Sequence, residues 1–296
     1  MLYEPTKEKI AKFIGDNRFY RKVFYVLLDI FILRQWYVKR VIKKYISQNK
    51  EILFFDAGAG FCQYSDFVLS KYKNARVCAV DLNIKSAGNG VICSALGTRE
   101  TFLNIATFPE AERINPFPTE GKSFLETQSR IVFVQANLES FKLTVEKADF
   151  VIAIDILEHI PDDISVLRNF YESMNEEGYL LISTPSNLDS AAAFTEEHVR
   201  LGYSLEELTE KVETRGFTVI EHKYSYGFWG KLYWKLIMRN GVIIANNKIL
   251  WVVLPIYLAL VFLPSLVFML LDMMCKNKSG NGIILVAKKV VDKKGL

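Results

Sequence analysis

Short runs of apolar residues recur along the middle of the chain, and each ends in a polar or glycine-containing turn. Runs this short, with little polar alternation, are typical of parallel strands that are buried on both faces. Five such runs lie at 51–56, 76–81, 131–135, 149–154 and 178–183, and two further strand candidates at 217–226 and 282–289. Segments with helical spacing separate several strands, at 62–72, 165–174 and 204–213. This alternation predicts an α/β fold whose sheet is covered by helices on both faces.

The first 50 residues have a different pattern, which indicates a helical and basic addition to this core. Tyr20, Phe24 and Phe31 are spaced as on one face of a helix. The segment has 12 Lys and Arg against 4 Asp and Glu, a net charge of +8 in a chain whose total is +4. Such an excess favours contact with an anionic surface, either lipid headgroups or nucleic acid; a solvated helix face is the alternative.

Residues 227–278 interrupt the core before its last strand. The stretch 249–271 carries no charge and is long enough for one membrane-spanning helix. Pro255 and Pro264 interrupt it, however, and a single span could not return the chain to the sheet. We therefore expect an interfacial or re-entrant helical hairpin, bent near the prolines, whose basic and aromatic flanks suit a membrane surface. The alternatives are a helical cap buried in the protein or in a dimer, and one true span if 282–289 lies outside the sheet.

These patterns divide the chain into four parts. They are a basic helical segment at 1–50, the core at 51–226, the hydrophobic insertion at 227–278, and the last strand with a basic tail at 279–296. Within the core, the connection 83–130 contains three prolines and is long for a link between two strands, which fits either a substrate lid or a loop. The four cysteines show no paired spacing, so a reducing compartment is expected.

The turn after the first strand, Asp56 to Gly60, has the composition of a nucleotide-binding loop. Gly58 and Gly60 let the backbone approach a ligand where a Cβ atom would collide. Gln63 stands in the place of the third glycine of the dinucleotide motif, which argues against a cofactor with a pyrophosphate. Asp81 ends the second strand, and a carboxylate there can accept hydrogen bonds from both hydroxyls of an adenosine ribose.

In these motifs and their order, the chain resembles the class I S-adenosylmethionine (SAM) dependent methyltransferases. The resemblance rests on residues 56–60, 81, 135–139, 155–160, 178–187 and 198–204. It implies a Rossmann-like seven-stranded sheet, mostly parallel with an antiparallel last strand, and SAM as the cofactor. It also implies that SAM contacts come from Asp56, Gly58, Gly60, Asp81, Asn137 and Asp155. Asn137 stands where many members place an aspartate against the adenine amino group.

Methyl transfer to an oxygen also needs a base for the acceptor's proton, and the chain has three histidines. His159 follows Glu158 after the fourth strand, and His198 lies in the loop after the fifth. Both histidines are expected to border the acceptor, together with Asp155 and Glu158. For His198 a structural role is the equal alternative, whereas His222, within a strand, is expected to be structural. In the ubiquinone-pathway O-methyltransferases a similar Glu-x-x-Glu-His stretch is implicated in metal binding; here Asp155 replaces the first glutamate, and no metal is expected.

The function expected from these features is methyl transfer from SAM to a lipid, quinone-like or glycolipid acceptor. The protein is expected in the cytoplasm, peripheral or monotopic at the membrane. No nucleic-acid-binding module is recognisable, so a nucleic-acid partner is not expected. One alternative is a soluble methyltransferase of a small metabolite or saccharide, with the apolar segment as a dimer surface. The other is a non-catalytic, membrane-docked protein that binds SAM. The pattern does not predict the oligomeric state.

Overall fold

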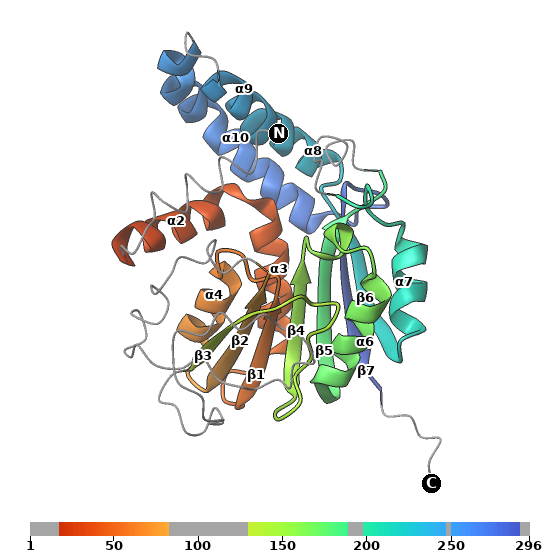
Figure 1. Ribbon diagram of the computed structural model, residues 1–296. Coiled ribbons are helices and arrows are strands. Elements are labelled where there is room, and N and C mark those ends of the chain that lie inside the picture. The colour runs from red at the N-terminus through yellow and green to blue at the C-terminus, as the bar shows by residue number, and fades with distance from the viewer. Residues whose placement is uncertain (1–17, 83–129, 189–197, 247–249, 291–296) are drawn as a thin grey trace.

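The computed structural model describes residues 18–82, 130–188, 198–246 and 250–290 (Figure 1). Apart from Arg130, the predicted lid or loop at 83–130 lies outside the described residues. Seven strands form one sheet in the order β3-β2-β1-β4-β5-β7-β6. The strands are β1 (Ile52–Ala57), β2 (Ala75–Asp81), β3 (Ile131–Gln135), β4 (Ala148–Ile154), β5 (Met174–Pro185), β6 (Phe217–Ser225) and β7 (Gly282–Lys289).

The direction of the strands decides where a site can form. Neighbouring strands run parallel except at β7, which lies antiparallel between β5 and β6. The predicted Rossmann-like sheet with an antiparallel last strand is therefore confirmed. Because β6 runs in the same direction as β5, the carboxyl ends of β1 to β6 and the amino end of β7 share one edge of the sheet. This carboxyl edge is where open α/β sheets bind ligands.

Helices cover both faces of the sheet, as the alternation predicted. The helices α3 (Leu33–Tyr45) and α4 (Gln63–Lys71) pack on one face, and α6 (Asp163–Ser173) and α7 (Leu205–Glu213) on the other. Phe54 and Phe55, neighbours in β1, are fully buried on opposite faces. The ring of Phe54 stacks on Phe150 with 5.7 Å between centroids, and the ring of Phe55 meets Phe170 of α6 edge-on at 5.8 Å. Each face therefore has its own aromatic core.

Two element boundaries show how local chemistry sets the fold. Ser204 caps α7 by accepting the Glu207 backbone N–H at 3.0 Å, as its position before the helix predicted. The strand β5 begins at Met174, earlier than the predicted Gly178, because the chain passes directly from α6 into the strand. The register shifts between Ala148 and Phe150 on the neighbouring β4, so these additional strand residues pair irregularly.

The basic N-terminal segment is helical from Arg18 to Tyr45, in two helices. They are α2 (Arg18–Phe31) and α3, and the chain leaves helical geometry at Ile32 between them. In α3 the residues toward the sheet, including Tyr37 and Val38, are buried, whereas Arg40 and Lys43 are exposed. Because α3 has one apolar face and one basic face, it can pack on the sheet with the first and leave the second in solvent.

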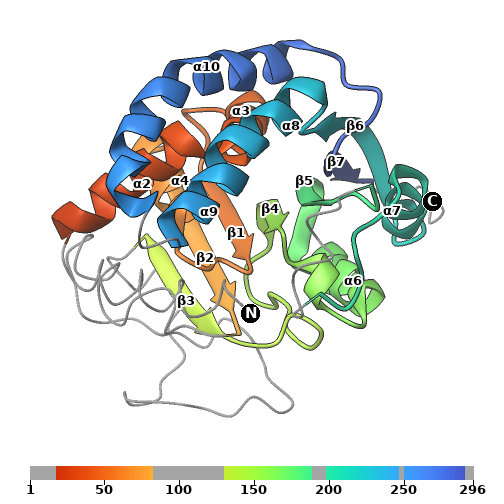
Figure 2. The ribbon, with the colours of Figure 1, turned by 90° about the horizontal axis from the view of Figure 1, so that it is seen from above.

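A helical hairpin stands between β6 and β7, on the carboxyl edge of the sheet (Figures 1 and 2). Its outgoing arm consists of α8 (Phe228–Trp234), the π-helical turn η5 (Lys235–Arg239) and α9 (Asn240–Asn246). After η6 (Leu250–Val253), α10 (Leu254–Met274) returns to the sheet. Within the described ranges α10 is the one helix long and apolar enough to cross a membrane, and only 11% of its apolar window is buried.

The hairpin bends beside one of the two prolines near which a bend was predicted, and not at the other. The chain reverses between α9 and α10, just before Pro255. Pro255 lies in the first turn of α10, where a backbone N–H has no partner in the helix, so proline is tolerated there. The helix continues through Pro264. The uncharged stretch therefore forms mainly one arm of the hairpin.

A buried carboxylate fastens the base of the hairpin to the rest of the molecule. Asp272 of α10 is fully buried and accepts hydrogen bonds from the Tyr37 hydroxyl at 2.9 Å and the Gly230 backbone N–H at 3.0 Å. The backbone N–H of Tyr226 donates to the same carboxylate at 3.1 Å. These donors come from α3, α8 and the end of β6, so one side chain holds three elements together.

Candidate active site

The loop after β1 has an uncommon backbone conformation that the sequence anticipated. Gly58 has a φ of +73°, Gly60 of +50°, and Cys62, which precedes α4, of +56°. A Cβ atom on Gly58 would lie 2.8 Å from the side chain of Ile156, so glycine is needed there for both conformation and space. A Cβ on Gly60 would meet nothing closer than 4.0 Å, which leaves open space beside the loop.

The backbone N–H groups of this loop are already engaged within the protein. Those of Gly58 and Ala59 both donate to the Val80 carbonyl, at 2.8 and 3.0 Å. The N–H of Gly60 donates to a carboxylate oxygen of Asp81 at 2.8 Å. These groups are thus directed at β2 rather than presented to a phosphate, which fits the sequence argument against a pyrophosphate-bearing cofactor. The same contact places Asp81 beside the loop, as a ribose ligand requires.

Asp56 and Asn137, two of the predicted SAM contacts, make hydrogen bonds within the protein. Asp56 is buried, and its carboxylate accepts from the Ser65 hydroxyl of α4 at 2.6 Å. Burial raises the pKa of Asp56 to about 7. The amide oxygen of Asn137 accepts the Glu139 backbone N–H at 3.0 Å and forms a turn after β3. Asp56 therefore shapes the loop, and a direct contact of either residue with SAM stays a prediction.

Asp155 directly follows β4 in a left-handed conformation, with a φ of +49°, and forms an ion pair with Arg34 at the start of α3. Its backbone N–H donates to the Ser183 carbonyl at 2.7 Å. The positive charge of Arg34 also lies near the buried Tyr64 of α4. Sequence reasoning missed Arg34, because nothing in the sequence separates it from the other cations of the basic segment. The structure shows it as a guanidinium held at the carboxyl edge, beside the predicted site.

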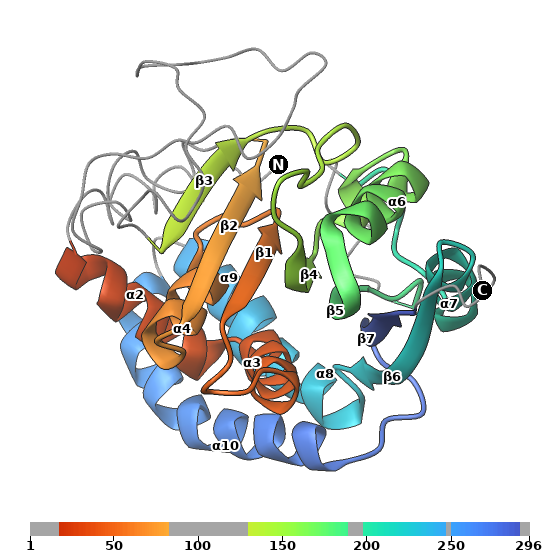
Figure 3. The same ribbon diagram turned by 90° about the horizontal axis from the view of Figure 1, so that it is seen from below.

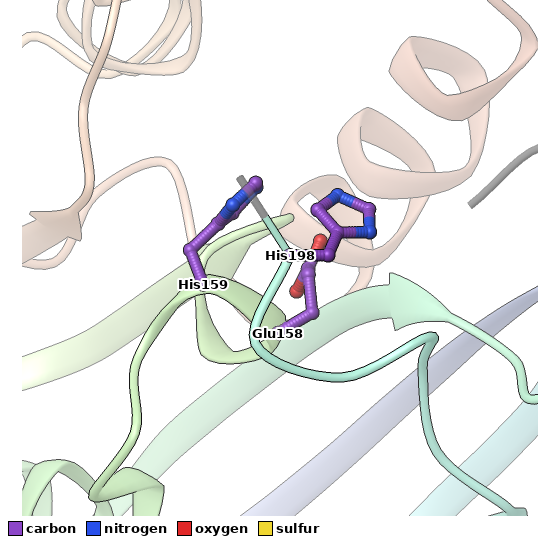
Figure 4. Close-up of side chains that lie close together, drawn as sticks. All are labelled: Glu158, His159 and His198. Atoms are coloured by element: carbon purple, nitrogen blue, oxygen red, sulfur yellow. The ribbon is translucent and has the colours of Figure 1, made fainter. Parts of the chain in front are cut away.

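Glu158, His159 and His198 come together although the two histidines stand 39 positions apart along the chain (Figure 4). The two imidazole rings meet edge-on with 4.5 Å between centroids. One ligand atom from each of the three residues lies within 4.8 Å of the others, a spacing that could also hold a metal ion. Glu158 is fully buried, its carboxylate accepts from the Thr184 hydroxyl at 3.1 Å, and burial raises its pKa. The structure therefore unites three of the four predicted acceptor-side residues.

The loop that carries His198 is fixed to the same turn. The backbone N–H groups of Val199 and Arg200 donate to the Glu158 carbonyl at 3.0 and 3.4 Å. Arg200 pairs with the buried carboxylate of Asp163, which also accepts from the Tyr203 hydroxyl at 2.7 Å. His222, by contrast, lies exposed in β6, as a histidine outside the site.

The helix α2 contributes a contact to the other end of the site. The Tyr25 hydroxyl donates to the Phe61 carbonyl of the glycine loop at 2.6 Å. The ring of Phe24 packs against the ring of Phe61 with 5.2 Å between centroids. The N-terminal addition therefore touches the site twice, through Tyr25 at the loop and through Arg34 at Asp155.

Comparison with known proteins identifies the family. A family model described as a methyltransferase domain matches residues 43–222, which is more than half of the chain. The chain therefore belongs to this family, and it is a SAM-dependent methyltransferase. No curated protein sequence matches it significantly.

Solved structures agree with this fold at low sequence identity. Phosphoethanolamine N-methyltransferase 2 of Haemonchus contortus, in complex with S-adenosyl-L-methionine, is 14% identical with a TM-score of 0.53; the match covers 86% of this chain and 52% of that one. StiE O-MT, residues 961–1257, is 11% identical with a TM-score of 0.52, over 88% and 75% of the two chains. The (4+2)-cyclase SpnF is 12% identical with a TM-score of 0.53, over 86% and 80%. These likenesses show the fold and leave the acceptor open.

Proposed function

We propose that this methyltransferase acts on a lipid, quinone-like or glycolipid acceptor at the cytoplasmic face of a membrane. The observation that carries the proposal is the position of the hairpin. The arms of the hairpin leave and rejoin the sheet at its carboxyl edge (Figure 2). Asp81, at the end of β2, and Asp155 and Glu158, just after β4, belong to the same edge. An apolar element there would bring the site to the depth at which lipid headgroups lie.

The outer face of α10 has the character such contact needs. Its exposed residues are all apolar, and the large ones are Ile256, Leu260, Leu263, Val267, Leu270 and Met274. We call these six residues the outer stripe. They follow one another at intervals of three or four residues and so lie on one face of the helix. A continuous apolar stripe of this length on a monomer indicates an interaction surface.

The site residues supply the rest of the reaction. SAM, when bound, offers a methyl carbon made electrophilic by its sulfonium. Gly58 and Gly60 give the backbone room for the cofactor, and Asp81 is placed to accept from its ribose. The imidazoles of His159 and His198 are the groups placed to accept the proton of an oxygen acceptor, with Glu158 fixed beneath them. The protein's contribution is mainly alignment of the two substrates and exclusion of water.

The test uses methyl-labelled SAM, purified protein and a membrane extract from the source cells. We expect label in the organic phase. Asp81→Ala should weaken SAM binding about 10- to 100-fold, because a charge-assisted hydrogen bond contributes roughly 1.5 to 3 kcal/mol. His198→Gln should lower turnover with SAM binding intact, whereas the matched His222→Gln, outside the site, should leave both unchanged.

Two results would contradict the proposal. Label that enters the aqueous phase alone would replace the lipid acceptor with a soluble metabolite or saccharide. Unchanged SAM affinity in Asp81→Ala would remove Asp81 from the cofactor site. Because the stripe's alternating spacing of three and four residues also suits helix pairing, a soluble acceptor would favour a dimer through α10, which light scattering would detect.

A further inference from the structure

A basic hollow lies on the outer side of α3, away from the site. Its volume is about 360 Å³, and it lies between the end of α2 and the exposed face of α3. Its lining consists of Asp29, Trp36, Lys39, Arg40 and Lys43. We call these five residues the basic hollow. Three cations and one carboxylate give it a net charge of +2 if all four are ionised.

The cations of the hollow are arranged so that two remain exposed. Lys39 forms an ion pair with Asp29, and its ammonium also lies 4.6 Å from the centre of the Phe67 ring. Arg40 donates to the Met273 carbonyl at 3.3 Å, and Lys43 lies near the same Phe67 ring. The side chains of Arg40 and Lys43 are exposed to solvent. The carboxylate of the hollow is therefore committed to Lys39, and the positive charge of the other two faces outward.

The basic hollow adjoins the end of the outer stripe. The hydrogen bond from Arg40 reaches Met273, and the next residue, Met274, is the last member of the stripe and 78% exposed. In Figures 2 and 3 the helix α10 runs beside α3. Lys276 and Lys278, just beyond α10, are exposed as well. Apolar and cationic surfaces thus meet at one end of α10.

We infer that the basic hollow binds the phosphate of an anionic phospholipid when the outer stripe lies in the bilayer. This inference rests on the membrane contact of the proposed function. A phosphodiester offers acceptor oxygens that a guanidinium and an ammonium both satisfy. Trp36 adds the amphipathic ring that is typical of the headgroup layer. A soluble phosphate would account for the cations but not for their meeting with the apolar stripe, so the bilayer lipid is the favoured source.

The experiment is co-sedimentation of the full chain with vesicles of phosphatidylcholine alone and of phosphatidylcholine mixed with phosphatidylglycerol. The double variant Arg40→Gln, Lys43→Gln removes two cations and leaves shorter, uncharged polar side chains in their place. We expect it to bind the mixed vesicles about 30-fold more weakly than the unchanged protein, which corresponds to about 2 kcal/mol. The matched control is Lys142→Gln, Arg168→Gln, two exposed cations on the face of the sheet that α6 covers, opposite α3 and α4, which should have little effect.

The outcomes separate the inference from the proposed function. SAM binding, measured on each variant, shows that the chain is folded. Equal losses of vesicle binding in the two double variants, or no loss in either, would contradict lipid binding at the basic hollow. Membrane contact through the outer stripe would then still stand. Binding of the unchanged protein to neither vesicle would overturn both. Release of bound protein by inorganic phosphate at constant ionic strength would show a soluble phosphate site in place of the lipid, and release by RNA alone would show a nucleic-acid surface.

Discussion

β1 and α10 are both strongly apolar, yet the fold treats them in opposite ways. All six residues of β1 are buried, with helices on both sides of the strand. The helix α10 packs one side against α8 and α3, where it is fastened by Asp272, and leaves the outer stripe exposed. The difference shows that an apolar composition indicates only that a segment is more stable away from water. Which surface it then meets depends on its place in the fold.

The largest expected effect is a loss of stability when a buried side chain of β1 is truncated. Phe54→Ala should lower the free energy of unfolding by roughly 3 to 5 kcal/mol, because it opens a cavity in the core between β1 and α4. Leu263→Ala, in the outer stripe and 67% exposed, should change it by no more than about 0.5 kcal/mol. Urea denaturation of the two variants checks the pair. Similar losses would mean that α10 is covered in solution, for example by a second copy.

The next largest effect is expected from removing the carboxylate of Asp272, which fastens the hairpin. Asp272→Ala should lower the free energy of unfolding by about 2 to 4 kcal/mol, because it leaves several buried donors without an acceptor. Asp272→Asn keeps one acceptor oxygen and should cost less. Amide hydrogen exchange should show the loss of protection confined to α8 and α10. Loosening of β1 as well would show that the hairpin and the sheet unfold as one unit.

The next prediction compares a glycine of the site, Gly58, with a glycine of the hairpin, Gly241. Gly58→Ala should destabilise the protein by about 1 to 3 kcal/mol and weaken SAM binding, since its φ is positive and Ile156 fills the space. Gly241→Ala in α9 meets nothing within 4 Å and should stabilise by about 0.5 to 1 kcal/mol. Thermal unfolding with and without SAM measures both. A stabilising Gly58→Ala would contradict the tight loop.

The last expected effect is a change of stability with pH. Because burial raises the pKa of Asp56 to about 7, the folded protein holds a proton that the unfolded chain releases near pH 4. Its contribution to stability is therefore full below about pH 4 and is lost as the pH rises through about 7, at no more than about 1.4 kcal/mol per pH unit. Asp56→Asn, which retains an acceptor for Ser65, should remove this slope without SAM present. If the stability of the unchanged protein and of Asp56→Asn depended on pH in the same way between pH 4 and 7, this prediction would be wrong.

Much of the sheet and of the cofactor side was predictable because its signals are local. β3 and β7 begin and end at the predicted residues, and the glycine loop with Asp81 has the geometry that its residue types demanded. Of the two prolines near which the hairpin was predicted to bend, the chain reverses just before Pro255, whereas the helix continues through Pro264. Proline at the first turn of a helix has a different effect from proline in its middle. Which of the two applies depends on where the helix begins, and the uncharged run does not mark that point.

The sequence by itself determined the alternation of strands and helices, the glycine loop and the family of the chain. These follow from side-chain periodicity and backbone freedom, which act within a few residues. Only the tertiary structure decided that Arg34 reaches Asp155, that His159 meets His198, and that Arg40 adjoins the end of α10. These are contacts between residues distant along the chain. They exist because the packing of whole elements brings their ends together, and no local pattern encodes that distance.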